Sequence, residues 1–299
     1  MADAAPRAAP LAGHEPLVDV HAHFLHARGG RRDWEVPNHA RMRAGERIGI
    51  TVHVASILGT WGHTSPVYFP SPRDVTLGND EMLAIQVRDP ERVRCYATVN
   101  PNDTAHALEE IARCAERGAV GVKLAASRRA DDSLIDPIAA AAERRHFPIL
   151  HHIWQHRTRE WPGQEISDGA DLGRLALRHP SVSFILAHIG GGGDYDHTFA
   201  AVADISNVYL DLSGSGVDRG MLDNAVRAVG ARRILWGSDI TMETGLAKLW
   251  ALEHVEPHLD ASAMSDIRWR NAARIFPAGA LPGVPVLERD ALAVAGHAR

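Results

Sequence analysis

The chain has few cysteines, no excess of basic residues and no long apolar run, and each absence narrows its function. Only Cys95 and Cys114 occur, without a CxxC pair, so neither a disulfide framework nor a thiolate zinc site is indicated, and a reducing, cytoplasmic setting fits. The formal net charge of −5 provides no basic stripe for nucleic acid or anionic membrane. No apolar stretch approaches the roughly 18 to 20 residues that span a bilayer. We therefore expect a small-molecule substrate and no nucleic-acid or membrane partner.

The sequence does contain a regular alternation of short apolar runs and longer amphipathic ones. Helical patterns such as 103–117, with an Asn-Asp start, and 133–145, which opens on Ser133 as a cap, lie between the apolar runs. Eight strands and eight helices in one domain of this length predict an α/β fold, a (β/α)8 TIM barrel. The eight apolar runs are 17–23, 50–57, 93–99, 119–124, 148–153, 182–188, 207–213 and 233–239.

The remaining segments divide the chain into one domain and two ends. Residues 1–16 lack the basic and apolar regions of a signal peptide and are expected to form a flexible tail. Residues 17–277 are assigned to the barrel, and residues 278–299 to a C-terminal extension that is expected to be helical. The segment 59–75 contains Pro, Gly and aromatic residues and predicts a long active-site loop after the second strand.

Metal-ligand residue types stand at the ends of the predicted strands. Because side chains alternate along a strand, Asp19, His21 and His23 are predicted to project from one side. Catalytic groups of a TIM barrel come from the carboxyl ends of its strands. Imidazoles and a carboxylate that converge there predict one divalent metal ion with room for a water molecule. The residues at these ends are His21, His23, Lys123, His151, His152, His188 and Asp239.

Several of these motifs together resemble a known family. Asp19-Val-His21-Ala-His23, Pro148-Ile-Leu-His151-His152, the segment from Phe184 to His188 with the glycines after it, and Leu235-Trp-Gly-Ser-Asp239 are similar to the amidohydrolase superfamily, specifically its amidohydrolase-2 branch. The resemblance covers residues 17–277 and includes a closing segment, 271–276. Members are (β/α)8 barrels that include hydrolases of amides and lactones and decarboxylases of unsaturated or aromatic acids.

The resemblance implies a role for each of these positions. His21, His23, His152 and Asp239 are expected to bind one metal ion, with zinc the first choice and manganese, iron or cobalt as alternatives. His188 is expected to be the base or water-activating group, and Asp239 to serve both as ligand and as proton acceptor. His151 and His152 face opposite sides of a strand, and the family spacing from Pro148 selects His152. The resemblance also leads us to expect a homo-oligomer.

Other residues keep more than one interpretation. Lys123 could be carboxylated and bridge two metal ions, or pair with a substrate carboxylate or with Asp239. Trp61, His63, Trp154 and Gln155 follow the second and fifth strands and are candidates for substrate binding. Asp19 is expected to orient a ligand imidazole.

These residues predict an enzyme. The first hypothesis is a hydrolase in which a metal-activated water attacks an amide or ester, including a lactone. The alternative is a metal-dependent, non-oxidative decarboxylase of an unsaturated or aromatic carboxylic acid that uses the same site. A barrel that binds ligands without catalysis is the third hypothesis, and the complete ligand set argues against it.

Overall fold

A computed structural model of the chain describes residues 15–26, 33–57, 71–124, 127–153, 167–190, 195–214, 220–239, 242–255 and 259–287. Within them, eight parallel strands form one sheet, and each strand pairs with the next along the chain. Every predicted apolar run contains one of these strands. They are β1 (Val18–His23), β2 (Val52–Ser56), β3 (Val93–Val99), β4 (Gly121–Leu124), β5 (Ile149–His151), β6 (Phe184–Leu186), β7 (Val208–Asp211) and β8 (Ile234–Leu235).

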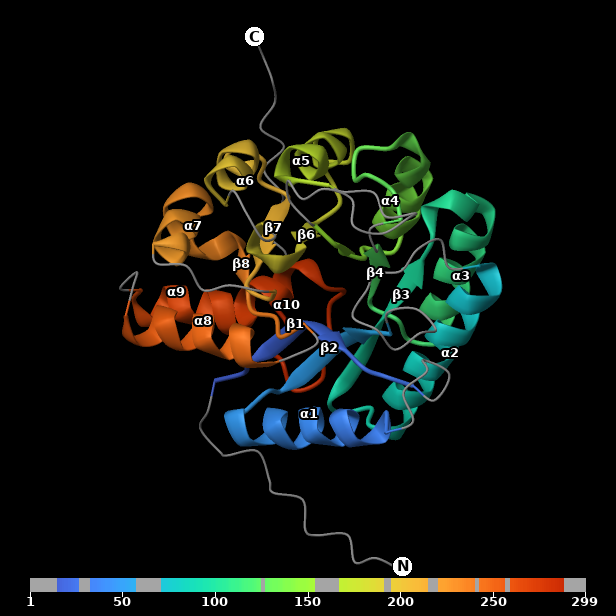
Figure 1. Cartoon of the computed structure of the whole chain (residues 1–299), viewed down its shortest axis with the longest axis horizontal. Helices are drawn as coiled ribbons and strands as arrows, with labels where there is room; N and C mark the ends of the chain where they lie inside the picture. The colour runs from blue at the N-terminus through green and yellow to red at the C-terminus, as the bar shows by residue number, and fades with distance from the viewer. Residues whose placement is uncertain are drawn as a thin grey trace, which may run out of the picture.

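Helices surround the ring of strands, so the predicted (β/α)8 TIM barrel is confirmed (Figure 1). No helix of the described residues is long and apolar enough to cross a membrane. The α-helices are α1 (Glu35–Ile48), α2 (Pro72–Arg88), α3 (Thr104–Glu116), α4 (Asp136–Glu143), α5 (Gly169–Arg178), α6 (Tyr195–Val202), α7 (Met221–Val229), α8 (Met242–His254), α9 (Ala261–Ser265) and α10 (Asn271–Ile275). Short 3-10 helices are η2 (Pro101–Asp103), η3 (Ser133–Ile135), η4 (Ala187–Gly190) and η5 (Ala231–Arg233), and η6 (Asp266–Arg270) is a π-helix.

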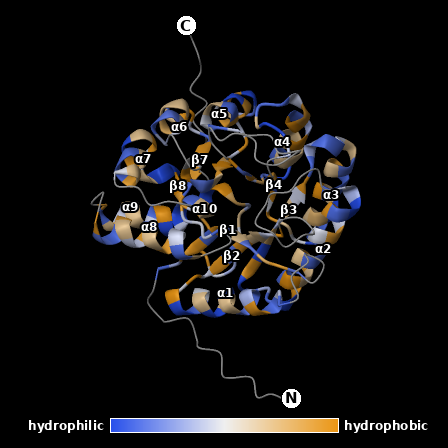
Figure 2. Ribbon diagram, in the orientation of Figure 1, coloured by the Kyte–Doolittle hydropathy of each residue, from blue (hydrophilic) through white to orange (hydrophobic). Residues whose placement is uncertain are grey.

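Two apolar clusters stabilise the barrel. One fills the layer between the strands and the surrounding helices, and the other lies inside the barrel, where Val20, Val54 and Leu150 meet Trp269 of η6 and Phe276 after α10. Figure 2 shows largely hydrophobic strands at the centre and helices that carry both kinds of residue. The barrel therefore has a packed apolar interior in the described residues, below the polar side chains at the carboxyl ends of the strands.

The seam between β8 and β1 closes the barrel with few backbone contacts. β8 has two residues, and an isolated bridge between Ala22 and Asp239 joins it to the first strand. The amide of Val20 donates to the carbonyl of Trp236 over 3.0 Å, and the amide of Asp239 donates to the carbonyl of His21 over 2.6 Å. The seam therefore brings His21 and Asp239 together, although they stand near opposite ends of the barrel sequence.

β1 departs from simple alternation. Asp19 pairs with His53, but Ala22 pairs with Ala55, so β1 carries one extra residue between these two points. This irregularity turns Asp19 to the outer side of the barrel, where its carboxylate lies 2.7 Å from Nδ1 of His53. The prediction that Asp19 shares one face with His21 and His23 is therefore wrong.

Helix starts also differ from the sequence-based expectations. α2 begins at Pro72, with Ser71 and Asp74 forming a capping box. The last residues of the predicted loop 59–75, from Pro72 on, therefore belong to this helix. Ser133 begins η3 and does not cap it, because the side chain of Asp132 accepts the hydrogen bond from the amide of Leu134. α3 starts after Asp103, whose carboxylate accepts from the amide of His106, as the Asn-Asp start predicts.

Candidate metal centre

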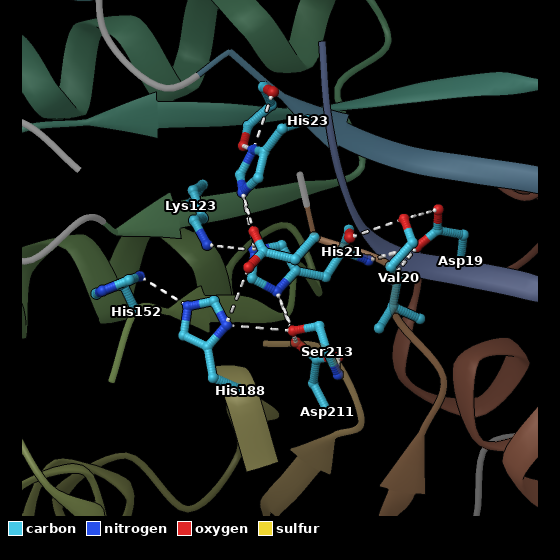
Figure 3. Close-up of polar contacts among 12 residues, drawn as sticks. Asp19, Val20, His21, His23, Lys123, His152, His188, Asp211 and Ser213 are labelled. Atoms are coloured by element: carbon cyan, nitrogen blue, oxygen red, sulfur yellow. Dashed lines mark hydrogen bonds and ion pairs between the residues drawn. The ribbon is translucent and has the colours of Figure 1, made fainter. Parts of the chain in front are cut away.

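His21 and His23 direct the same ring nitrogen into the barrel mouth. Nδ1 of His21 lies 2.6 Å from Oδ2 of Asp211, and Nδ1 of His23 lies 3.2 Å from the carbonyl oxygen of Ser56. Because both acceptors face Nδ1, each ring keeps its proton there and presents the Nε2 lone pair. The two Nε2 atoms are 3.0 Å apart (Figure 3).

Asp239 completes this group from the other side of the seam. Its Oδ1 lies 3.2 Å from Nε2 of His23 and 3.8 Å from Nε2 of His21. Its backbone φ is 57°, a left-handed conformation that residues other than glycine rarely adopt. Burial raises the pKa of Asp239, but the neighbouring imidazoles of His188, His23 and His21 outweigh it, so the pKa lies well below its usual range. The side chain is therefore a carboxylate.

His188 lies beside the same carboxylate and contacts His152. Nδ1 of His188 is 3.4 Å from Oδ2 of Asp239, and its Nε2 is 2.8 Å from Nδ1 of His152. His188 has a φ of 67°, and Gly214 packs so closely that a Cβ atom there would lie 2.5 Å from Cβ of His188. Burial lowers the pKa of His188 to about 3. The ring is therefore neutral at neutral pH.

Lys123 adds a cation to the group. Its side chain is fully buried, and Nζ lies 2.9 Å from Nε2 of His21. Burial lowers the pKa of Lys123 to about 8. The Lys123 ammonium donates to the Nε2 lone pair of His21. A metal ion bound by His21 would use the same lone pair.

Sequence reasoning assigned no role to Asp211 and Ser213, which the structure places against the ligands. Ser213 Oγ lies 2.9 Å from Nδ1 of His21 and 2.6 Å from Oδ2 of Asp211. Gly237, which follows β8, makes room for Asp211, because a Cβ atom there would lie 2.2 Å from Oδ1 of Asp211. An aspartate near the carboxyl end of the seventh apolar run was a usable signal, since acidic residues at strand ends are candidate ligands or partners of ligands, and Asp211 is the last residue of β7.

These donor atoms fit a divalent cation. His21, His23 and Asp239 each offer one ligand atom, all within 4.8 Å of one another. Two imidazole nitrogens on a tetrahedral zinc ion lie about 3.3 Å apart, because each bond is about 2.0–2.1 Å long. The two Nε2 atoms, 3.0 Å apart, are close to this separation, so one ion between them could bind both lone pairs. His152 is not one of these three residues. It contacts His188, beside the candidate metal centre.

The remaining predicted residues divide into two groups. His151 lies on the outer side of β5, fully buried, with Nδ1 2.8 Å from the carbonyl oxygen of His152. Its register partners, Leu124 and Leu186, belong to the apolar layer under the helices. Trp61, His63, Trp154 and Gln155 lie outside the described residues.

A family model described as amidohydrolase matches residues 18–278, nearly the whole of the barrel and its closing helices. The chain belongs to the amidohydrolase-2 family. A search of curated proteins found no match to this amidohydrolase-2 chain.

Solved structures share the fold at low sequence identity. An amidohydrolase described as putative from Staphylococcus aureus is 18% identical, with a TM-score of 0.63 over 87% of this chain and 99% of the other. The 2,6-dihydroxybenzoate decarboxylase from Rhizobium is 16% identical, with a TM-score of 0.66 over 88% and 98%. A dihydroxybenzoic acid decarboxylase from Polaromonas, solved with bound manganese and the inhibitor 2-nitroresorcinol, is 16% identical, with a TM-score of 0.64 over 88% and 97%.

Proposed function

We propose that this amidohydrolase-2 chain is a metal-dependent hydrolase that cleaves an amide or ester bond, including a lactone, in a small organic molecule. One observation supports this most directly. The carboxylate of Asp239 turns Oδ1 towards Nε2 of His23 and Oδ2 towards Nδ1 of His188. One side chain thus joins the group that would hold the metal ion to a neutral base.

His21, His23 and Asp239 would hold one divalent ion, with His152 as the proposed fourth ligand. Imidazole and carboxylate donors suit zinc, manganese, iron and cobalt alike. The bound ion would lower the pKa of a water molecule and polarise the substrate carbonyl. Zinc is the first ion to test, and manganese the second, because the Polaromonas decarboxylase with this fold was solved with manganese.

The chain's own residues would then move the protons. The carboxylate of Asp239 can accept the proton of the attacking water at Oδ2, and Nδ1 of His188, 3.4 Å from that oxygen, would receive it after a small approach in the substrate complex. On the other side of the ring, Nε2 of His188 lies 2.8 Å from Nδ1 of His152. The same proton can return through Asp239 or His188 to the leaving group when the tetrahedral intermediate collapses.

Lys123 supports decarboxylation as a second candidate. A metal ion on Nε2 of His21 would leave the Lys123 ammonium in need of another acceptor, because that nitrogen is 2.9 Å away and now fills the role. A substrate carboxylate would supply one, and several solved proteins with this fold are named decarboxylases. Carboxylation of Lys123 with a second metal ion is the other way to remove the charge.

Metal content and product analysis test these proposals together. The protein is prepared without added metal, loaded with Zn²⁺ or Mn²⁺, and counted for metal per chain by elemental mass spectrometry. Lactones, esters and amides are then followed by acid release in a pH-stat, and aromatic and unsaturated acids by carbon dioxide release. One ion and acid release support the hydrolase, with His188→Asn expected to retain the ion and lose about 100-fold or more in rate.

Other outcomes choose between the alternatives. Carbon dioxide release without hydrolysis supports the decarboxylase. Two ions per chain that fall to one in Lys123→Met support the carboxylated lysine. A wild-type protein that binds neither Zn²⁺ nor Mn²⁺ contradicts the metal-dependent mechanism.

A further inference from the structure

A buried polar network lies behind the candidate metal centre, on the outer side of the barrel. It includes Asp19 of β1, Arg41 of α1 and Ser238 after β8, and also His53 of β2, whose Nδ1 lies 2.7 Å from Oδ2 of Asp19, and all four are buried. Oδ1 of Asp19 accepts from the amide of Ser238 over 3.0 Å, and Oδ2 accepts from the Ser238 hydroxyl over 2.6 Å. NH1 of Arg41 donates to the same hydroxyl over 2.6 Å and lies 3.6 Å from Oδ2 of Asp19. The hydroxyl of Ser238 thus bridges the two charged side chains of a buried ion pair.

The network makes hydrogen bonds to the backbone on both sides of the Asp239 side chain. Ser238 precedes Asp239, and NH2 of Arg41 donates to the carbonyl oxygen of Asp239 itself. The amide of Asp239 is held separately by the carbonyl oxygen of His21. Oδ1 of Asp19 also accepts from the amide of His21 over 3.3 Å. The same charged pair therefore touches the backbone of two proposed ligands from opposite strands of the seam.

Asp239 needs such support because of its conformation. A φ of 57° at a residue with a side chain is strained and persists only where the surroundings enforce it. Arg41 holds the carbonyl oxygen of Asp239, and Asp19 holds Ser238 just before it, so the backbone is fixed on both sides. The strain is thus located at the residue that joins the metal ligands to His188.

We propose that Arg41 is a positioning residue which, together with Asp19 and Ser238, holds Asp239 in its strained conformation and so sets the affinity of the site for its metal ion. This rests on the proposed metal site. No motif pointed to Arg41, which lies in α1, 198 positions from Asp239. A positioning role predicts weaker metal binding when Arg41 is replaced, whereas its charge alone predicts tighter binding.

The direction of the change in metal affinity separates a positioning role of Arg41 from a purely electrostatic one. Arg41 is a buried cation beside a site for a cation, so its charge by itself weakens metal binding. Replacing it with methionine removes that repulsion and would tighten binding if charge were its only effect. If Arg41 positions Asp239, the same replacement weakens binding, as loss of a partner behind a metal ligand typically does.

The experiment compares dissociation constants for Zn²⁺, measured by competition with a chelator, on metal-free protein. Arg41→Met is expected to bind Zn²⁺ about 10- to 100-fold more weakly than wild type. Arg41→Lys keeps the charge but loses the planar fork, so an intermediate loss is expected. Arg92→Met is the matched control, because Arg92 also anchors α1, through Glu46 and the carbonyl oxygen of Met42, without touching Asp239.

Ser238→Ala covers the case in which Arg41→Met does not fold, since it removes only the bridging hydroxyl and leaves both charges in place. It is expected to weaken Zn²⁺ binding several-fold while Arg92→Met stays within about twofold of wild type. Unchanged or tighter binding in Arg41→Met, or in Ser238→Ala where Arg41→Met is unfolded, overturns the positioning role and leaves the metal site standing. A wild-type protein without affinity for Zn²⁺ or Mn²⁺ overturns both.

Discussion

At the residue scale, the function of each histidine depends on what holds its second nitrogen. Asp211 and the carbonyl oxygen of Ser56 fix Nδ1 of His21 and of His23, and both rings then offer Nε2 to the same point. His151 has similar burial but faces the apolar layer outside the barrel, where Nε2 has no hydrogen-bond partner among the described residues. Two neighbouring residues of one type, His151 and His152, therefore belong to different environments.

His151 gives a prediction about acid stability. Burial lowers its pKa to about 4 in the folded chain, against an ordinary value of 6.5. Between these values the unfolded chain binds a proton that the folded chain does not, so the free energy of unfolding falls as pH falls from about 6.5 to 4. The contribution is fully present above pH 6.5, and a shift of this size corresponds to about 3 kcal/mol.

The measurement is urea unfolding of metal-free protein at pH 7 and pH 4.5. His151→Gln is expected to lose less stability between the two pH values than wild type, whatever its stability at pH 7. His254→Gln, on the exposed side of α8, serves as the control. Equal losses in wild type and His151→Gln would show that His151 does not carry this proton linkage.

At the element scale, the strands were predictable and the geometry of β1 was not. Each strand is a buried apolar run of a few residues, and burial on both faces makes such runs stand out in a barrel. The extra residue between Asp19 and Ala22 leaves no trace in composition, because a bulge depends on pairing with the neighbouring strand. Asp19 was therefore placed on the wrong face, and the network with Arg41 could not be foreseen.

The packing of Asp211 from β7 and His21 from β1 against the segment after β8 depends on Gly237, which gives a second prediction. A Cβ atom at Gly237 would lie 2.2 Å from Oδ1 of Asp211 and 2.9 Å from Cβ of His21. Gly237→Ala is therefore expected to displace Asp211 from His21, to lower the free energy of unfolding by about 1–3 kcal/mol and to weaken metal binding. Urea unfolding and chelator competition measure the two effects.

Gly78 in α2 is the matched control, because a Cβ atom there meets nothing within 4 Å. Gly78→Ala is expected to stabilise the chain by about 0.5–1 kcal/mol, since alanine favours a helix over glycine, and to leave metal binding unchanged. The two glycine-to-alanine changes should thus have opposite signs. If Gly237→Ala kept both stability and metal affinity, the close approach of the two strands would not matter to the site.

At the scale of the whole molecule, the proposed metal site lies across the weakest joint of the barrel. β8 is two residues long, and β1 meets the segment that follows β8 through the bridge between Ala22 and Asp239 and a few backbone hydrogen bonds. His21 and His23 come from the first strand and Asp239 from the end of the last. A metal ion held by all three would connect both ends of the sheet, so binding and closure of the barrel should be coupled.

Metal removal should therefore loosen the seam more than the rest of the barrel. An ion at 100 times its dissociation constant adds about 2.7 kcal/mol to the free energy of unfolding, which raises the melting temperature by several degrees. Hydrogen exchange of the amides of Val20 and Asp239, which bond across the seam, should quicken when metal is removed. The amide of Val122, which bonds to Pro148 between β4 and β5, should change far less. Equal changes at all three amides would mean that the ion stabilises the barrel as a whole and does not fasten β1 to β8.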